Sequence, residues 1–246
     1  MIGSVPESIS ILPVLPRAPS AALASVRARI VACTRCERLR LYGENIGRVR
    51  RRAYAQETYW ALPVPGFGDA KARILILGLA PGAHGANRTG RPFTGDGSGH
   101  FMYPVLHAVG LASKPQGTAA NDGLKLRNVW IGCVVRCAPP GDKPTPLEIR
   151  NCGSHLTAEI AALPRVRLVV CLGRIAWDGY LAHLVLTGVI QKRSAYPFAH
   201  GAEYTLPNGL LLMGSYHPSL RNTNTGRLNE PMFLRIFVRA QELVGM

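Results

Sequence analysis

Residues 78–99, GLAPGAHGANRTGRPFTGDGSG, are the stretch that decides the fold. A mainly apolar run, RILIL at 73–77, precedes this stretch, and the apolar segment FMYPVLHAV at 101–109 follows it. This order predicts a buried strand, a long polar loop rich in glycine, and then a helix. Open α/β sheets place their binding sites in such loops, at the carboxyl ends of strands. Glycines let the backbone approach a ligand closely, and the start of a helix offers free N–H groups to an anion.

The glycine-rich loop does not match the common nucleotide-binding loops. It lacks the Gly-Lys-Ser/Thr ending of a nucleoside-triphosphate loop and the compact Gly-x-Gly-x-x-Gly of a dinucleotide site. The alternative, a long connection without chemistry, is uncommon in compact domains. We therefore interpret the loop as part of a functional site.

Strand-like and helix-like segments alternate along the rest of the chain. Strands are expected at 73–77, 128–136, 167–172 and 209–214, and helices at 20–31, 101–109, 174–186, 232–243 and after the capping-box sequence TPLE at 145–148. This alternation predicts an α/β fold, a three-layer α/β/α sandwich around a central, mostly parallel four-stranded sheet. Residues 1–18 are predicted to form a flexible N-terminal tail and residues 19–246 a single domain.

The charge of the chain narrows the class of partner. The formal net charge is +15, which attracts polyanions, with nucleic acid the first candidate and a membrane surface the second. No stretch approaches 18 uninterrupted apolar residues, and the N-terminus does not resemble a signal peptide, because Glu7 stands where positive charge is usual. We expect a cytoplasmic protein without a membrane partner.

The six cysteines divide into two groups. Cys133 and Cys171 lie inside apolar strand-like runs, where a free thiol behaves as a small hydrophobic side chain. The other four fall at element ends and form one candidate metal site: Cys33, Cys36, Cys137 and Cys152. Four thiolates suit zinc and an iron–sulfur cluster equally well by geometry. A surface thiol pair with two unrelated cysteines is the remaining alternative.

His217 is the second candidate centre of chemistry. It follows the apolar run at 209–214, and Pro218 fixes the turn behind it. The carboxyl ends of parallel strands meet at one edge of a sheet, so His217 is expected near the glycine-rich loop. A histidine in this place can stabilise a developing negative charge or act as an acid or a base.

Together these segments resemble the uracil-DNA glycosylase superfamily, specifically its family 5, the b-type enzymes that contain an iron–sulfur cluster. The matching motifs are GLAP at 78–81, GANRTGRPFTGD at 85–96, RCAPP at 136–140 and YHPS at 216–219. Further similarity lies at 59–60, 63–68, 172–177 and 222–228, and the resemblance covers the chain from about Val31 to its end.

The resemblance implies a function and a fold. The fold would be the α/β/α sandwich of that superfamily with an embedded 4Fe–4S cluster. The function would be that of a monofunctional DNA glycosylase in base excision repair. Such an enzyme flips uracil, and other deaminated bases, out of DNA and hydrolyses the N-glycosidic bond to leave an abasic site. We expect a monomer associated with the nucleoid. The alternative is a non-catalytic binder of damaged or single-stranded DNA with a structural iron–sulfur cluster.

The resemblance also implies roles for individual residues. Phe93 would stack on the flipped base, and His217 would hydrogen-bond a base oxygen. Gly78, Ala80 and Pro81 lie in the turn that lines the pocket and places the attacking water. Ala80 stands where better-known relatives carry Asp or Asn, so water activation must come from elsewhere. The polar candidates in the loop are Asn87 and Asp96, and the sequence does not rank them.

Cys133 and the DNA-contacting residues complete the predicted site. Many superfamily members read the pyrimidine edge with an Asn where this chain has Cys133, and a thiol lacks the paired donor and acceptor of an amide. A range of deaminated bases wider than uracil is therefore expected. Residues expected to hold the DNA backbone are Ser98, Ser219, Arg221 and Asn222. The four cysteines would bind the 4Fe–4S cluster, which the resemblance favours over zinc.

Overall fold

Among residues 21–246, which the computed structural model describes, six strands form one mixed sheet. The order across the sheet is β1-β3-β2-β4-β6-β5. The strands span Phe67–Gly68 (β1), Ile74–Gly78 (β2), Val129–Cys133 (β3), Leu168–Leu172 (β4), Glu203–Thr205 (β5) and Leu211–Ser215 (β6). The tail predicted for residues 1–18 lies outside the described residues.

The central strands β3, β2, β4 and β6 are the four that the sequence predicts, and they are parallel to one another. The two edge strands were not predicted, and both pair antiparallel, β1 with β3 and β5 with β6. They contain only two and three residues, and neither is buried along its length. Such short segments lack the apolar run by which a strand is recognised from sequence.

The central strands are buried on both faces, as in parallel sheets covered by helices. Along β2, Ile74 and Ile76 pack into one apolar cluster, whereas Leu75 and Leu77 pack into another. This alternation follows from the two-residue period of a strand, which sends successive side chains to opposite faces. Each face of the sheet therefore has its own core.

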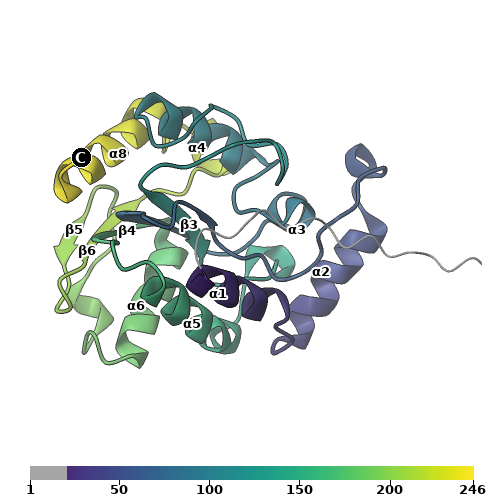
Figure 1. Ribbon diagram of the computed structural model, residues 1–246, viewed down its shortest axis with the longest axis horizontal. Helices are drawn as coiled ribbons and strands as arrows, with labels where there is room; N and C mark the ends of the chain where they lie inside the picture. Colours follow the sequence, from purple (N-terminus) through teal and green to yellow (C-terminus); the bar gives the residue numbers. More distant parts are fainter. Residues whose placement is uncertain (1–20) are drawn as a thin grey trace, which may run out of the picture.

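Helices cover the two faces in separate layers (Figure 1). Helices α4 and α8 lie on one face, and α1, α5 and α6 lie on the other. These helices span Ala21–Val31 (α1), Gly97–Ala108 (α4), Pro146–Ala161 (α5), Arg174–Leu186 (α6) and Glu230–Val244 (α8). The three-layer α/β/α arrangement is confirmed.

The strand order creates a switch point in the sheet. Strand β3 lies on one side of β2, whereas β4 and β6, which follow in the chain, lie on the other side of β2. Ligands of open α/β sheets bind outside the carboxyl ends of the strands at such a point. Gly78 pairs in register with Cys133, and Leu172 pairs with Ser215, so adjacent strands end at matching levels. Four chain segments therefore emerge together beside the switch point.

Helix α2 (Glu37–Val49) is not among the helices expected from the sequence. It is joined to α5 at the capping box, which forms as expected between Thr145 and Glu148. The Glu148 carboxylate accepts hydrogen bonds from Arg38 Nε and Nη2, both at 2.8 Å.

The shorter elements are α3 (Ala86–Thr89), α7 (Leu220–Asn224) and three 3₁₀ turns, Arg52–Tyr54 (η1), Pro140–Asp142 (η2) and Arg193–Ala195 (η3).

A buried ion pair fixes the chain where it leaves β3. Arg136 and Glu159 are each 1% exposed, and two hydrogen bonds of 3.2 and 2.6 Å join the guanidinium to the carboxylate. Glu159 also accepts a hydrogen bond from the Gly66 N–H at 3.2 Å. Because a buried charge without its partner is costly, this pair holds the segment after β3 firmly against α5.

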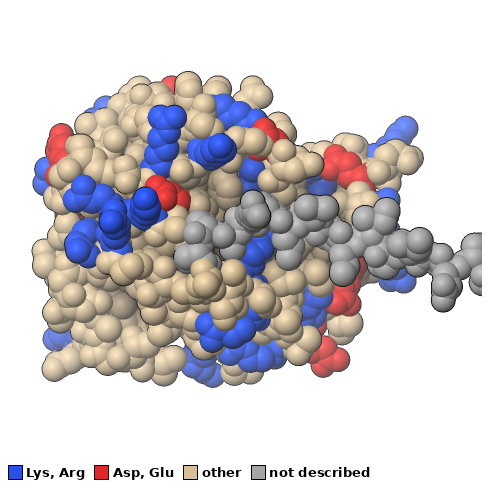
Figure 2. All heavy atoms as spheres, in the orientation of Figure 1, with Lys and Arg blue, Asp and Glu red and all other residues tan. Residues whose placement is uncertain are grey.

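Basic side chains outnumber acidic ones on the face shown in Figure 2, in line with the net charge of +15. They are spread over several elements of this face rather than confined to one patch. None of the helices within residues 21–246 combines the length and the apolar character needed to cross a membrane.

Candidate active site

A cavity of about 710 Å³ opens at the carboxyl ends of the parallel strands. Most of its wall comes from the segments that follow β2, β4 and β6. Cys133 at the end of β3, Asp142 and Phe198 complete it. The glycine-rich loop and the turn after β6 both contribute, as the sequence predicts. The cavity therefore lies at the switch point of the sheet.

Phe93 and His217 meet in this cavity. Their ring centroids lie 6.0 Å apart, with an angle of 34° between the ring planes. Phe93 comes from the glycine-rich loop and His217 from the turn after β6, so residues 124 positions apart in the chain (217 − 93) share one wall. The spacing allows one planar ligand to contact both rings. Their roles in a reaction remain predictions.

Phe93 is held in a strained conformation. Its φ of +51° lies in the left-handed region, which costs a bulky side chain about 1–3 kcal/mol. Two glycines pack closely around it. A Cβ on Gly78 would lie 2.9 Å from the Phe93 ring, and a Cβ on Gly99 would collide with the Phe93 carbonyl oxygen. Gly78 thus contributes to the site from behind the Phe93 ring, although it does not itself line the cavity.

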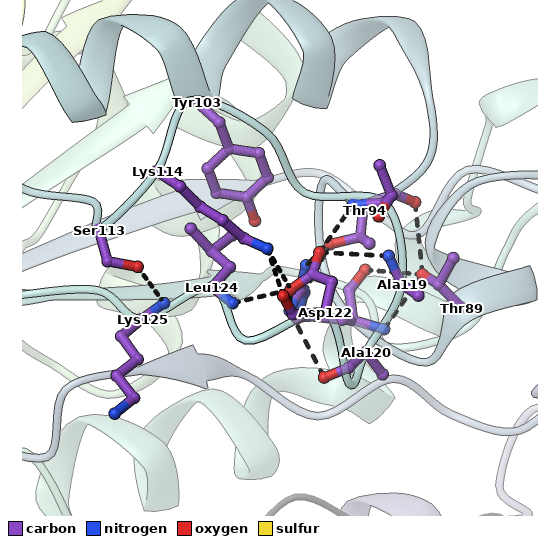
Figure 3. Close-up of polar contacts among 12 residues, drawn as sticks. Thr89, Thr94, Tyr103, Ser113, Lys114, Ala119, Ala120, Asp122, Leu124 and Lys125 are labelled. Carbon is purple, nitrogen blue, oxygen red and sulfur yellow. Dashed lines mark hydrogen bonds and ion pairs between the residues drawn. The ribbon is translucent and has the colours of Figure 1, made fainter.

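An ion pair anchors the loop beside Phe93. Arg91, only 3% exposed, donates to both Asp122 carboxylate oxygens, at 3.0 and 2.7 Å. Arg91 Nε also donates to Thr94 Oγ1 at 2.8 Å. Asp122, which is labelled in Figure 3, also accepts from the N–H groups of Thr118 and Leu124, at 2.7 and 2.8 Å. The residues on both sides of Phe93 are therefore fixed.

The segment at 114–123, which lies between α4 and β3 and for which the sequence predicts no strand or helix, supplies this anchor. Burial opposes ionisation of Asp122, but the hydrogen bonds from Arg91 and from backbone N–H groups outweigh it and hold the pKa of that carboxyl well below its usual range. Asp122 is therefore ionised at neutral pH. The loop that carries Phe93 depends on a charge supplied by a separate part of the chain.

His217 is a neutral imidazole at neutral pH. Burial lowers its pKa to about 4, because the charged form loses solvation. Its backbone carbonyl accepts a hydrogen bond from Asn222 Nδ2 at 2.8 Å, and a Cβ on Gly173 would lie 3.0 Å from the His217 Cβ. The described residues provide no hydrogen-bond partner for the ring nitrogens, so a ring N–H is available to a ligand in the cavity.

Asp96 is the acidic side chain of the glycine-rich loop that lines the cavity. It caps α4, where its Oδ1 accepts from the Gly99 N–H at 2.9 Å. The other oxygen, Oδ2, packs directly against Gly85, where a Cβ would collide with it. Burial raises the pKa of Asp96, although the Gly99 N–H opposes this effect. A carboxylate with a raised pKa in a cavity is a candidate general base.

Asn87 lies outside the cavity lining. Its side chain is buried, and Nδ2 donates to the carbonyl oxygens of Gly43 at 3.2 Å and Ala83 at 3.4 Å. The amide therefore joins α2 to the loop. Of the two polar candidates that the sequence left unranked, the geometry favours Asp96 over Asn87.

The other predicted base-contacting and DNA-contacting residues line the cavity: Ala80, Pro81, Cys133, Ser98, Ser219, Arg221 and Asn222. Burial raises the pKa of the Cys133 thiol to about 12, so Cys133 is neutral. Sequence reasoning missed two exposed apolar side chains of the lining, Ile175 at 55% and Leu220 at 60%. Each stands at the start of a helix that follows a parallel strand, and this position is the signal that could have identified them.

The four cysteines of the candidate metal site, Cys33, Cys36, Cys137 and Cys152, lie near one another. Cys36, Cys137 and Cys152 belong to the apolar cluster on the α5 side of the sheet. Burial, together with charge repulsion from the neighbouring thiols of Cys152, Cys33 and Cys36, raises the pKa of Cys137 to about 12. All four are free thiols. Among the described residues, no group of three or more potential ligands is arranged to hold a single metal ion.

Comparisons with known proteins agree with the motifs. A family model described as the uracil DNA glycosylase superfamily matches residues 65–241. The chain is 52% identical over 217 residues to the type-5 uracil-DNA glycosylase of Thermus thermophilus, covering 88% of this chain and 96% of that protein. It is 44% identical over 225 residues to the Mycobacterium tuberculosis type-5 uracil-DNA glycosylase, covering 91% and 82%. The identity to the Pyrobaculum aerophilum type-5 protein is 42% over 217 residues, covering 88% and 91%.

Replacing Asp122 with Asn should lower the free energy of unfolding by about 3–5 kcal/mol, because it leaves the Arg91 charge buried without its partner. The native pKa of Asp122 is depressed, so its contribution is complete above the unfolded value of about 3.9 and is lost as the pH falls below it. Denaturant unfolding from pH 7 to pH 3 measures both effects. The exposed residue Glu242, changed to Gln, is the control and should alter stability far less. A difference between Asp122→Asn and the parent that stays constant down to pH 3 would contradict the ion-pair assignment.

Proposed function

The chain belongs to the type-5 group of the uracil DNA glycosylase superfamily, and on this basis we propose that it excises uracil from DNA by hydrolysing the N-glycosidic bond. The observation that carries the proposal is the pair of Phe93 and His217 in one cavity at the carboxyl edge of the sheet. The resemblance inferred from the motifs is confirmed at the level of the family.

The chemistry requires a base outside the duplex. A base within the stack is out of reach, so it must be flipped into a pocket, at a cost of a few kcal/mol. Phe93 offers an aromatic face on which the extruded ring can stack. As the glycosidic bond breaks, negative charge develops on the departing base, and a donor aimed at that charge stabilises the transition state. The neutral His217 ring supplies such a donor.

Water attack on the sugar requires a base, and Asp96 is the residue we propose for it. Ala80 cannot activate water, and the Asn87 amide is engaged by Gly43 and Ala83. Asp96 Oδ2 lies against Gly85, next to the turn that includes Ala80. Burial raises the pKa of Asp96, and this strengthens its carboxylate as a proton acceptor.

We extend the proposal to other deaminated bases. The base-facing wall contains the Cys133 thiol, which cannot form the paired hydrogen bonds that single out one pyrimidine edge. A site without such a paired contact discriminates weakly between bases. The cavity of about 710 Å³ leaves room for a purine as well as a pyrimidine. A non-catalytic DNA binder is not favoured, because the relatives that span most of the chain are named as glycosylases.

His217→Ala tests the proposed glycosylase function and the role of His217 in base release. In single-turnover assays on duplexes that carry uracil, hypoxanthine or xanthine, the parent protein should release the base. The variant should be slower by about 10²–10³-fold, the usual cost of one donor to a developing anion. Its dissociation constant for the same DNA should change little. Equal losses in base release and in DNA binding would contradict the role of His217, and no base release by the parent would support the non-catalytic binder.

Asp96→Asn tests the water-activating role while preserving the helix cap, since Asn caps helices as well as Asp. The rate of uracil release should fall by about 10²–10⁴-fold. The parent rate should rise with pH through the raised pKa of Asp96 and then level off, whereas the variant should lack this rise. Asn87→Ala is the comparison, and it should affect stability more than the pH profile. A normal rate and an unchanged pH profile in Asp96→Asn would exclude Asp96 as the base.

We also propose that Cys33, Cys36, Cys137 and Cys152 bind a 4Fe–4S cluster. The donor set fits, because four free thiols from three separate segments lie close enough for their charges to interact. A bound cluster would supply iron–thiolate bonds that join these segments. Cys36 lies immediately before α2, and Cys137 precedes the turn that contains Asp142, a residue of the cavity wall. The cluster would thus hold α2 and this wall together.

Cys137→Ser should abolish the visible absorbance and iron content of the purified protein and lower its melting temperature. Cys171→Ser is the matched control, since Cys171 is also buried but lies within β4 and is not one of the four proposed ligands. The control should keep its iron and its visible spectrum even if its stability falls. An unchanged spectrum in Cys137→Ser would remove Cys137 from the ligand set.

The remaining parts of the proposal concern assembly and place of action. We propose that the protein acts as a monomer on DNA in the cytoplasm, in association with the nucleoid. A substrate of DNA and a net charge of +15 support this setting.

A further inference from the structure

We propose that residues 48–58, here called the arginine arm, bind the sugar–phosphate backbone of DNA outside the cavity. This inference rests on the DNA substrate of the proposed function and adds a second contact surface to it. The arm consists of the end of α2, the 3₁₀ turn η1 and the residues that follow.

Two guanidinium groups of the arm are free to bind an anion. Arg48 donates to Asn45, and Arg50 donates to the carbonyl oxygens of Gly47 and Ala55. Arg51 and Arg52 are exposed, and their side chains have no hydrogen-bond or ion-pair partner among the described residues. Adjacent, unpaired arginines suit phosphate groups, which arginine binds through planar, paired hydrogen bonds.

The arm is held in place rather than left as a loose tail. The Arg88 guanidinium stacks on the Tyr54 ring, 3.9 Å from its centroid, and forms an ion pair with Glu57. The Arg51 N–H donates to the Tyr59 hydroxyl at 3.5 Å, and Arg50 adopts a left-handed φ of +57°. A preorganised contact surface loses less entropy when it binds.

The arm adjoins the loop that forms the cavity. The Tyr59 hydroxyl lies 2.9 Å from His84 Nδ1, and His84 is two residues from Gly82 in the cavity wall. Arg88 donates to the carbonyl oxygens of His84 at 2.8 Å and of Gly95 at 2.9 Å, so one buried side chain ties the arm to two separate points of the loop. Figure 1 shows α2 beside α3, the short helix of that loop.

The charge of Arg51 acts on His84, a residue of the glycine-rich loop. Burial lowers the pKa of His84, and the nearby charges of Arg51 and Arg88 lower it further. A DNA strand that delivers a base to the cavity carries phosphates past its rim. Arg51 and Arg52 are placed to contact phosphates a short distance along that strand. Contacts of this kind add affinity without reading sequence.

The test compares two double variants with the same loss of charge. Arg51→Gln with Arg52→Gln removes the arm cations. Arg127→Gln with Arg165→Gln removes two exposed cations that precede β3 and β4. Both lie at the amino ends of the strands, whereas the cavity lies at the carboxyl ends. Binding to an undamaged duplex is measured across a range of salt concentrations, and uracil release is measured at saturating protein.

For the arm variant, the slope of log K against log salt should be smaller in magnitude by about 1.8, because each lost phosphate contact contributes about 0.9. The control variant should keep both the parent slope and the parent rate of uracil release. An arm variant that matches the control would overturn the proposal and leave its cations to another partner, such as an anionic membrane or an acidic protein.

The outcome does not depend on catalysis, because the undamaged duplex requires no base release. Suppose that the parent protein fails to release uracil, while the slope of log K against log salt is still smaller in the arm variant than in the parent. This result would refute the proposed function and leave the arm as a DNA contact. A parent that releases uracil, with an unchanged slope in the arm variant, would refute the arm alone.

Discussion

The ion pair between Arg91 and Asp122 is the interaction on which the site depends most. It is nearly buried, it is bidentate, and it joins positions 31 residues apart. Phe93, two residues from Arg91, sits in a conformation that a bulky side chain avoids. Such strain persists only where the surroundings over-determine it. Here the surroundings are the Arg91–Asp122 pair, the Thr94 hydroxyl and the two glycines that leave room for Phe93.

The sheet supplies the second half of the site. Strand order places β2, β4 and β6 side by side, so the turn after β6 brings His217 opposite the Phe93 loop. Burial makes the His217 ring neutral, and the same burial raises the pKa of Asp96. One environment thus gives a histidine that donates without carrying charge and a carboxylate that is a stronger base. Both properties suit the cleavage of a glycosidic bond beside an anionic leaving group.

Much of this arrangement follows from sequence, and the rest has identifiable reasons for not doing so. Four apolar runs predict the four parallel strands, and the TPLE motif at 145–148 predicts the start of α5. The edge strands are too short to carry a pattern. Asn87 and Asp96 are equally polar members of one loop, and only packing shows that one faces α2 and the other the cavity. The partner of Arg91 lies in a segment whose composition indicates only a linker.

The most direct measurement is a crystal structure of the protein with a duplex that carries a 2′-fluorinated deoxyuridine, whose glycosidic bond resists hydrolysis. The uracil ring should lie outside the duplex, stacked on Phe93, with one of its carbonyl oxygens within hydrogen-bonding distance of a His217 ring nitrogen. A uracil that occupies the cavity without touching either ring, or that is bound at another surface, would contradict the central claim that these two side chains form the base-binding slot.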